Sequence, residues 1–206
     1  MRLLLVFLLS LSLSCVSNQK INTGSIFLEK TDFLYYTDDE RPYLWRELPI
    51  KWTFVSSFPQ KFRPHAREGF EHWERMTGID LFIEIPDTNV LRDGGIRSAA
   101  MPTIVVTWSN GLSKINEKRL GEAKQRKRID GEIFFSYIRY YKPWFKTDEG
   151  KMLTTARHEV GHALGFSHVG YSHKDCLMYT FITDEKDGKI ACEREIEIMK
   201  EAYAWR

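Results

Sequence analysis

Three histidines and one glutamate lie close together in the chain, at spacings that suit a metal site. The run from His158 to His168 reads H-E-V-G-H-A-L-G-F-S-H, so His158 and His162 are four residues apart. That spacing is about one turn of an α-helix, which brings both imidazoles to one face, within reach of one zinc ion. Glu159 lies beside the first ligand, where its carboxylate can take a proton from a water molecule at that ion. The spacing therefore predicts hydrolysis by metal-activated water.

Gly165 follows three residues after His162 and is expected to end this helix. Glycine adopts positive φ at little cost, so the chain can turn back and present His168 as a third ligand. Three protein ligands leave one coordination position open for water and substrate, as a catalytic zinc site requires. His173 is an alternative third ligand that the spacing disfavours. An amphipathic core helix with buried histidines would explain neither Glu159 nor the glycine.

This run resembles the signature of the metzincin metallopeptidases, H-E-x-x-H-x-x-G-x-x-H followed by a methionine turn. Residues 176–179 read C-L-M-Y and place Met178 ten residues beyond His168, where such a turn is expected. Gly161 and Leu164 within the run, together with the L-M-Y sequence, are most similar to the matrixins. The resemblance implies that Met178 forms the hydrophobic floor beneath the zinc and is not itself a ligand.

The resemblance also implies where an extended substrate binds. The strand that contains Ile133, Phe134 and Phe135 is expected to be the exposed edge of the sheet and to pair with the substrate backbone. Tyr179 and Phe181 are expected to line the pocket for the residue after the scissile bond. The implied activity is zinc-dependent cleavage of internal bonds in protein or peptide substrates by a monomer. Calcium is a further candidate cofactor that no motif supports.

The sequence departs from the matrixin pattern at two positions near the site. Thr180 stands where matrixins usually have proline after the L-M-Y turn, and Val169 follows the third histidine. An inactive alternative is a catalytically weak, zinc-containing surface lipoprotein or binding module. The intact Glu159 argues against that alternative, because this residue is needed for the chemistry and not for holding the metal.

Strand and helix patterns surround the motif and predict an α+β fold. The order of elements predicts a twisted mixed β-sheet with an active-site helix and a C-terminal helix, as in a metzincin catalytic domain. Alternating or β-branched apolar runs predict strands, and apolar residues at helical spacing predict helices. The expected strands are 50–55, 81–85, 103–108 and 132–136, and the expected helices are 64–76, 151–164 and 193–203.

The first residues are typical of an export signal. Arg2 precedes an apolar run that reaches Leu13, and small residues stand just before Cys15. Cys15 resembles the lipidated cysteine of bacterial lipoproteins, which favours an envelope protein attached to the membrane by a lipid over a freely secreted one. Disulfides persist outside the cytoplasm, so Cys176 and Cys192 are expected to form one bridge, with two free thiols as the alternative.

The length of 206 residues predicts one catalytic domain after a leader. Residues 1–15 are expected to be the leader, 16–47 a tether or N-terminal extension with some wrapping onto the domain, and 48–206 the catalytic domain. The net charge of +2 does not point to nucleic acid as a partner. The basic residues between Lys114 and Arg128 predict a solvated loop, or alternatively a surface that favours acidic substrates or anionic lipids.

Overall fold

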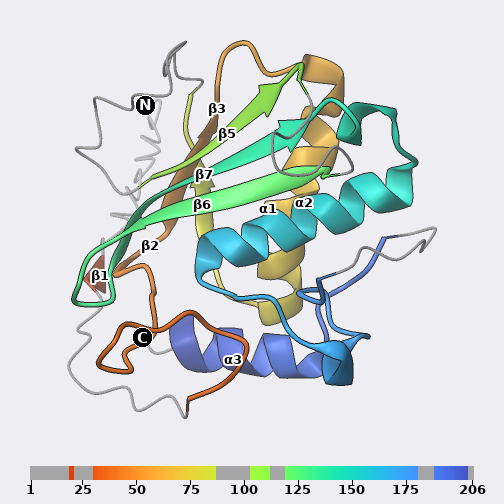
Figure 1. Cartoon of the computed structure of the whole chain (residues 1–206). Helices are drawn as coiled ribbons and strands as arrows, with labels where there is room; N and C mark the ends of the chain where they lie inside the picture. Colours follow the sequence, from red (N-terminus) through yellow and green to blue (C-terminus); the bar gives the residue numbers. More distant parts are fainter. Residues whose placement is uncertain (1–18, 21–29, 87–102, 112–118, 181–187, 204–206) are drawn as a thin grey trace, which may run out of the picture.

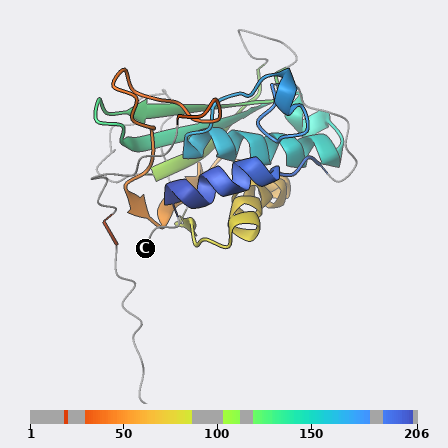
Figure 2. The ribbon, with the colours of Figure 1, turned by 90° about the horizontal axis from the view of Figure 1, so that it is seen from below.

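The computed structural model describes residues 19–20, 30–86, 103–111, 119–180 and 188–203. Within them, five strands form one mixed sheet, and the α-helices lie together on one side of it (Figures 1 and 2). The strands of this sheet are β3 (Ile50–Phe54), β4 (Phe82–Glu84), β5 (Thr103–Ser109), β6 (Gly121–Lys127) and β7 (Ile133–Tyr141). The α-helices are α1 (Arg63–Thr77), α2 (Glu149–Leu164) and α3 (Glu193–Tyr203). This is the α+β architecture that the sequence predicts.

The sheet has the order β4–β3–β5–β7–β6, in which only β6 runs antiparallel to its neighbour. A separate pair of two-residue strands joins β1 (Gln19–Lys20) to β2 (Glu47–Leu48). Short 3₁₀ helices occupy Gln60–Phe62, Trp144–Lys146 and Tyr171–His173. None of the helices in the described ranges is long and apolar enough to cross a membrane.

Helix α2 is held between α1 and the sheet. The Trp73 indole on α1 donates a hydrogen bond of 2.9 Å to the Arg157 carbonyl oxygen on α2. A Cβ at Gly69 would lie 2.6 Å from the Ala156 carbonyl oxygen, so the two helices approach each other closely at this glycine. Aromatic rings continue the packing from α1 to the sheet, where Phe70 stacks on Trp52 with 4.0 Å between ring centroids. Helix α1 therefore supports one side of the motif helix, and the Gln125 amide of β6, which donates to the His162 carbonyl oxygen, holds the other.

Residues 30–45, which we call the N-terminal hairpin, pack onto the domain. Phe33, Leu34 and Trp45 are buried in the core, and the Trp45 indole donates a hydrogen bond of 2.8 Å to the Ala163 carbonyl oxygen. This packing agrees with the expected wrapping of an N-terminal extension onto the domain, but it places core side chains before residue 48, where the domain was expected to begin. The segment has no regular apolar spacing because its buried side chains come from turns and isolated bridges.

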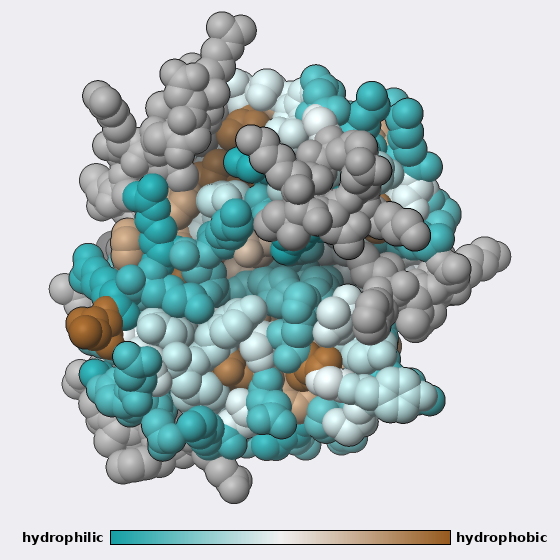
Figure 3. All heavy atoms as spheres, viewed as in Figure 1, coloured by the Kyte–Doolittle hydropathy of each residue, from teal (hydrophilic) through white to brown (hydrophobic). Residues whose placement is uncertain are grey.

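The structure corrects the predicted edge of the sheet. Strand β7 lies between β5 and β6, and its Ile133 and Phe135 are buried, so neither its backbone nor these side chains can meet a substrate. Among the described residues the edge beyond β7 is β6, with the sequence G-E-A-K-Q-R-K, which lies within the basic segment predicted to be a solvated loop. Edge strands commonly carry charged side chains that prevent aggregation, so apolar alternation does not reveal them. In the view of Figure 1, hydrophilic side chains gather along a hollow across this face (Figure 3).

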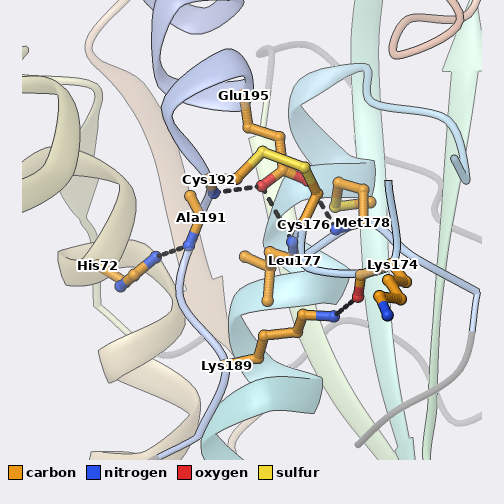
Figure 4. The surroundings of a disulfide bond; sticks show 9 residues. All are labelled: His72, Lys174, Cys176, Leu177, Met178, Lys189, Ala191, Cys192 and Glu195. Atoms are coloured by element: carbon orange, nitrogen blue, oxygen red, sulfur yellow. Dashed lines mark hydrogen bonds between the residues drawn. A yellow bond between two sulfur atoms is a disulfide. The ribbon is translucent and has the colours of Figure 1, made fainter. Parts of the chain in front are cut away.

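His72 on α1 is a buried histidine outside the metal motif. Its Nε2 accepts a hydrogen bond of 3.1 Å from the Ala191 N–H, which requires the neutral ring (Figure 4). Burial, and then the charges of Arg157 and Arg75, lower the pKa of His72 from 6.5 to about 3. In the unfolded chain His72 therefore binds a proton near pH 6.5, whereas in the folded protein it stays neutral at this pH. The stability contributed by neutral His72 is complete above pH 6.5 and is lost as the pH falls toward 3.

We expect His72→Gln to make the stability of the protein less sensitive to acid, because glutamine can accept the same hydrogen bond but does not titrate. Between pH 7 and pH 5 the wild type should lose about 2 kcal/mol more free energy of unfolding than the variant. Urea denaturation of both proteins at the two pH values measures this difference. Parallel losses in the two proteins would contradict the role of His72.

Candidate metal centre

The capping residues at the two ends of α2 set the position of the histidine motif. At the N-terminus, the Asp148 carboxylate accepts a hydrogen bond of 2.9 Å from the Lys151 N–H, which is a favoured N-cap interaction. At the C-terminus, Gly165 has φ of 116°, and its N–H bonds to the His162 carbonyl oxygen at 3.0 Å. A Cβ at Gly165 would also collide with the Tyr43 carbonyl oxygen. Glycine is therefore required here both for the turn and for the close approach of the N-terminal hairpin.

The three motif histidines converge on one point. The Nε2 atom of His168 lies 3.1 Å from Nε2 of His158 and 3.0 Å from Nε2 of His162. Nitrogens bound at about 2 Å from one tetrahedral zinc ion are separated by about 3.3 Å, so the three positions fit a single ion. The described residues place no other set of three histidines together, and His173 is not part of this group. The expectation that His158, His162 and His168 can hold one zinc ion is confirmed.

Backbone carbonyl groups fix the tautomers of two of these rings. The Nδ1–H of His158 donates to the Leu177 carbonyl oxygen at 2.9 Å, and that of His162 donates to the Phe166 carbonyl oxygen at 2.9 Å. Each Nε2 atom is then left with a lone pair directed at the shared point. Such hydrogen bonds are the usual way in which a protein orients metal-binding histidines. The chain thus prepares both rings as ligands before any ion arrives.

Burial keeps the ligand histidines neutral. Burial is the main cause that lowers the pKa of His158 to about 4, and it also lowers the pKa of His162 and of His168. Mutual repulsion between the rings adds to this effect for His158 and His162. Metal binding requires unprotonated imidazoles, so a site with these pKa values is ready for a cation at neutral pH.

Glu159 lies beside the triad and is held by β6. A Cβ at Gly121 would lie 2.9 Å from Glu159 Cγ, so the absence of a side chain at residue 121 makes room for the carboxylate. The Ala123 N–H donates to this carboxylate, whereas Glu159 Oε2 has no hydrogen-bond partner among the described residues. Burial raises the pKa of Glu159 to about 8, against the opposing charge of Arg119. Glu159 follows the ligand His158 in the chain, and one of its carboxylate oxygens is thus available to accept a proton from water.

Met178 lies beneath the helix that carries the ligands. Its side chain is fully buried, and a Cβ at Gly161 would come within 2.5 Å of its sulfur and 2.9 Å of the Trp73 ring. Glycine at position 161, one residue before the ligand His162, therefore allows the methionine to pack directly against α2. The Val169 N–H donates to the Met178 carbonyl oxygen at 3.1 Å, which connects the methionine turn to the loop that carries His168.

The methionine turn is anchored to α3 by a buried carboxylate and a disulfide. Glu195 accepts hydrogen bonds from the N–H groups of Leu177, Met178 and Cys192 at 3.0, 2.7 and 2.8 Å (Figure 4). Cys176 and Cys192 form a disulfide across the same junction. The Leu177 carbonyl oxygen in turn accepts the hydrogen bond from His158. The role of Glu195 is not evident from the sequence, because a glutamate in the first turn of a helix usually faces solvent.

The pocket role expected of Tyr179 and Phe181 stays a prediction. Tyr179 is half-buried after Met178, with its ring 6.5 Å from that of Tyr171. Phe181 and Cys15 lie outside the described residues. Gln125 on β6 was not expected; its side-chain amide donates to the His162 carbonyl oxygen and ties the edge strand to α2. Only the three-dimensional pairing of β6 with α2 reveals this contact.

Comparison with known proteins gives a family for the chain. The sequence profile described as matrixin matches residues 44–204. No curated protein matches. Archaemetzincin from Methanopyrus kandleri aligns with a TM-score of 0.48 and 12% identity, over 76% of this chain and 96% of that one. High choriolytic enzyme 1, a hatching-enzyme zinc protease from Oryzias latipes, aligns with a TM-score of 0.45 and 11% identity, over 84% of this chain and 95% of that one.

The matched residues contain the whole site described above. They include the three histidines, Glu159, the methionine turn and α3, and zinc is the cofactor of this class of protease. The profile covers well over half of the sequence, and the residues that it covers place the zinc-binding histidines and the methionine turn in one fold. The chain is therefore a member of the matrixin family, the metzincin zinc metallopeptidases that its motif resembles.

Proposed function

We propose that this metallopeptidase is an endopeptidase that binds its substrates in extended form along β6. The observation that carries the proposal is that Glu159, the residue after the ligand His158 on α2, packs against Gly121 and Ala123 of the edge strand. Within the described ranges, β6 pairs with β7 along one side and with no strand along the other, so that other side can accept an extended peptide. A peptide that pairs along the strand passes Ala123 and brings an internal bond to Glu159.

Zinc, when bound, supplies a Lewis acid that makes water more acidic and polarises the peptide carbonyl. The protein side of the reaction is carried by Glu159, whose unpartnered Oε2 accepts the proton of the attacking water. The same oxygen can then return the proton to the leaving amine. Gly121 and the Ala123 N–H hold the carboxylate in place during both transfers. His158, His162 and His168 provide neutral nitrogens and take no part in the proton transfer.

Peptides with blocked termini test the endopeptidase proposal. We expect the protein to cleave an internally quenched peptide whose amino and carboxyl ends are both blocked, and mass spectrometry should locate an internal cut. Treatment with a zinc chelator should abolish the cleavage, and one equivalent of zinc should restore it. Cleavage restricted to peptides with a free terminus would contradict the endopeptidase assignment, whereas cleavage that persists in chelator would contradict the metal mechanism.

We also propose that the enzyme acts outside the cytoplasm, anchored by a lipid on Cys15. The Cys176–Cys192 disulfide supports export, because such bridges persist mainly in oxidising compartments. The intact mass of protein isolated from membranes tests the anchor. A mature chain that begins at Cys15 with the mass of attached acyl chains is expected, and an unmodified amino terminus would refute the anchor.

A further inference from the structure

The N-terminal hairpin is docked against the loop that carries the third histidine. The Tyr35 N–H donates to the Gly165 carbonyl oxygen at 3.1 Å, and the Ser167 N–H donates to the Phe33 carbonyl oxygen at 2.8 Å. These bonds flank an antiparallel bridge between Leu34 and Phe166. Most of the hairpin precedes residue 44, where the match to the matrixin family begins. It therefore adds side chains to the active-site face that the family match does not account for.

Two tyrosines of the hairpin enclose a lysine of the edge strand. Lys127 Nζ lies 4.1 Å from the ring centroid of Tyr35 and 4.3 Å from that of Tyr43. Both distances are well within the range in which a cation is attracted to an aromatic face. The Tyr43 N–H donates to the Tyr35 carbonyl oxygen at 2.9 Å, which holds the backbones of the two tyrosines side by side. The ammonium group is thus held in one place at the end of β6.

This lysine is near the catalytic groups. The Tyr35 ring is 6.5 Å from the His162 ring, and the charge of Glu159 contributes, after burial, to raising the pKa of Tyr35. Gln125, two residues before Lys127, donates to the His162 carbonyl oxygen. The register of β6 with β7 shifts between Arg126 and Lys127, so the contact of Lys127 with the Tyr35 ring, which neighbours His162, is what places Lys127 on the α2 side of β6.

The direction of β6 decides which part of a substrate meets Lys127. Ala123 is beside Glu159, and Lys127 comes four residues later along the strand, a distance of about 13 Å. A peptide that pairs antiparallel to β6, the more stable pairing, runs in the opposite direction. Its residues before the scissile bond then lie opposite the end of β6, so Lys127 faces a side chain about two to four residues on the amino-terminal side.

The described residues provide no carboxylate within ion-pair distance of Lys127. By contrast, Lys124 and Arg128 on either side are paired with Glu122 and Glu132, at 3.7 and 2.8 Å. Burial lowers the pKa of Lys127 to about 8, so the ammonium is poorly hydrated and gains from a nearby anion. A carboxylate brought by a bound peptide would supply that anion.

We propose that Lys127, held between Tyr35 and Tyr43, selects substrates with an acidic side chain on the amino-terminal side of the scissile bond. The proposal rests on the endopeptidase function proposed above and assigns the N-terminal hairpin a part in specificity. The proposal also assigns a preference for acidic substrates to one residue among the basic residues between Lys114 and Arg128, because the other basic side chains of β6 contact neighbouring side chains. Arg126 lies over the Phe135 ring, and Lys124 is near Glu122.

Matched peptides test this selection. Each carries Glu, Gln or Lys at one of the four positions before a mapped scissile bond, and cleavage is measured as kcat/KM. At the position opposite Lys127, wild type should prefer Glu to Lys by about tenfold, the size expected for one partly shielded charge pair. Lys127→Met should bring the ratio close to one, and Lys127→Glu should reverse it. Tyr35→Leu, which removes one ring, should lower the ratio, and the control Lys124→Met should keep it.

Binding of the same peptides, fluorescently labelled, to the Glu159→Ala protein separates the two proposals. Charge-dependent binding without any cleavage by wild type would refute the endopeptidase function and support the Lys127 site. Cleavage by wild type that is equal for Glu, Gln and Lys at all four positions would overturn the Lys127 site and leave the endopeptidase function standing. The Lys127 site would also be overturned if Lys127→Met and Lys124→Met lowered the Glu-to-Lys ratio equally. The preference would then reflect the total positive charge of the surface and not one residue. Zinc content and thermal midpoint verify that each variant is folded.

Discussion

The Glu159→Gln protein should keep its zinc while its kcat/KM falls by about a thousandfold. The three nitrogens that converge to bind the metal are the Nε2 atoms of histidines, so the substitution of Glu159 removes no ligand. Glutamine has nearly the same shape and can still accept the hydrogen bond from Ala123. Its amide cannot take up the proton of the attacking water, which is the step assigned to Oε2. Metal analysis and the rate of cleavage of one quenched peptide measure the two effects separately.

Glu149→Gln is the matched control for this experiment. Glu149 is on the same helix, but its side chain is largely exposed and distant from the metal point. The same chemical change there should leave both zinc content and kcat/KM near the wild-type values. Chelator-sensitive cleavage at the wild-type rate by Glu159→Gln would show that another group acts as the base. Loss of zinc from Glu159→Gln would show instead that the carboxylate contributes to metal binding.

The metal centre could be predicted from the sequence because most of its geometry is local. The spacing of His158 and His162 fixes their separation on one helix, and the turn at Gly165 brings His168 back within eleven residues of the first ligand. Helix spacing and glycine conformation are properties of short segments, so one chain is enough to infer them. The close approach of Tyr43 to Gly165 was not predictable, because it depends on a segment more than a hundred residues earlier.

The edge strand and the N-terminal hairpin could not be predicted for a different reason. In β6, Lys124 and Arg126 point away from α2, while the other face carries Gly121 and Ala123. Small residues at those positions make room for Glu159 and give no apolar alternation. Strand β7, by contrast, has the strong apolar pattern of a buried strand, and that pattern was assigned to the wrong position in the sheet. Hydrophobic pattern reports burial, and it does not report which strand is outermost.

The largest loss of stability is expected from Glu195→Ala, which should reduce the free energy of unfolding by about 3–5 kcal/mol. Glu195 is fully buried, and its carboxylate accepts three backbone hydrogen bonds from the methionine turn and the start of α3. Burial raises the pKa of this carboxyl group, and the three N–H groups oppose that effect. Alanine would leave all three donors buried without an acceptor. Each unsatisfied donor costs about 1–3 kcal/mol, partly relieved where water can enter.

The same substitution should also weaken the metal site, which separates a positioning role from general destabilisation. Glu195 holds the Leu177 N–H, and the Leu177 carbonyl oxygen orients His158. Zinc should therefore dissociate from Glu195→Ala about tenfold faster, an effect typical of losing a hydrogen bond that orients a metal ligand. Urea denaturation and transfer of zinc to a chelating dye measure the two effects.

Glu197→Ala is the matched control, because Glu197 lies on the same helix with its side chain exposed and paired with Arg194. That control should change stability by less than about 0.5 kcal/mol and leave zinc release unaltered. Faster zinc release in both variants, or in neither, would mean that the carboxylate anchors α3 alone and does not reach the metal through Leu177.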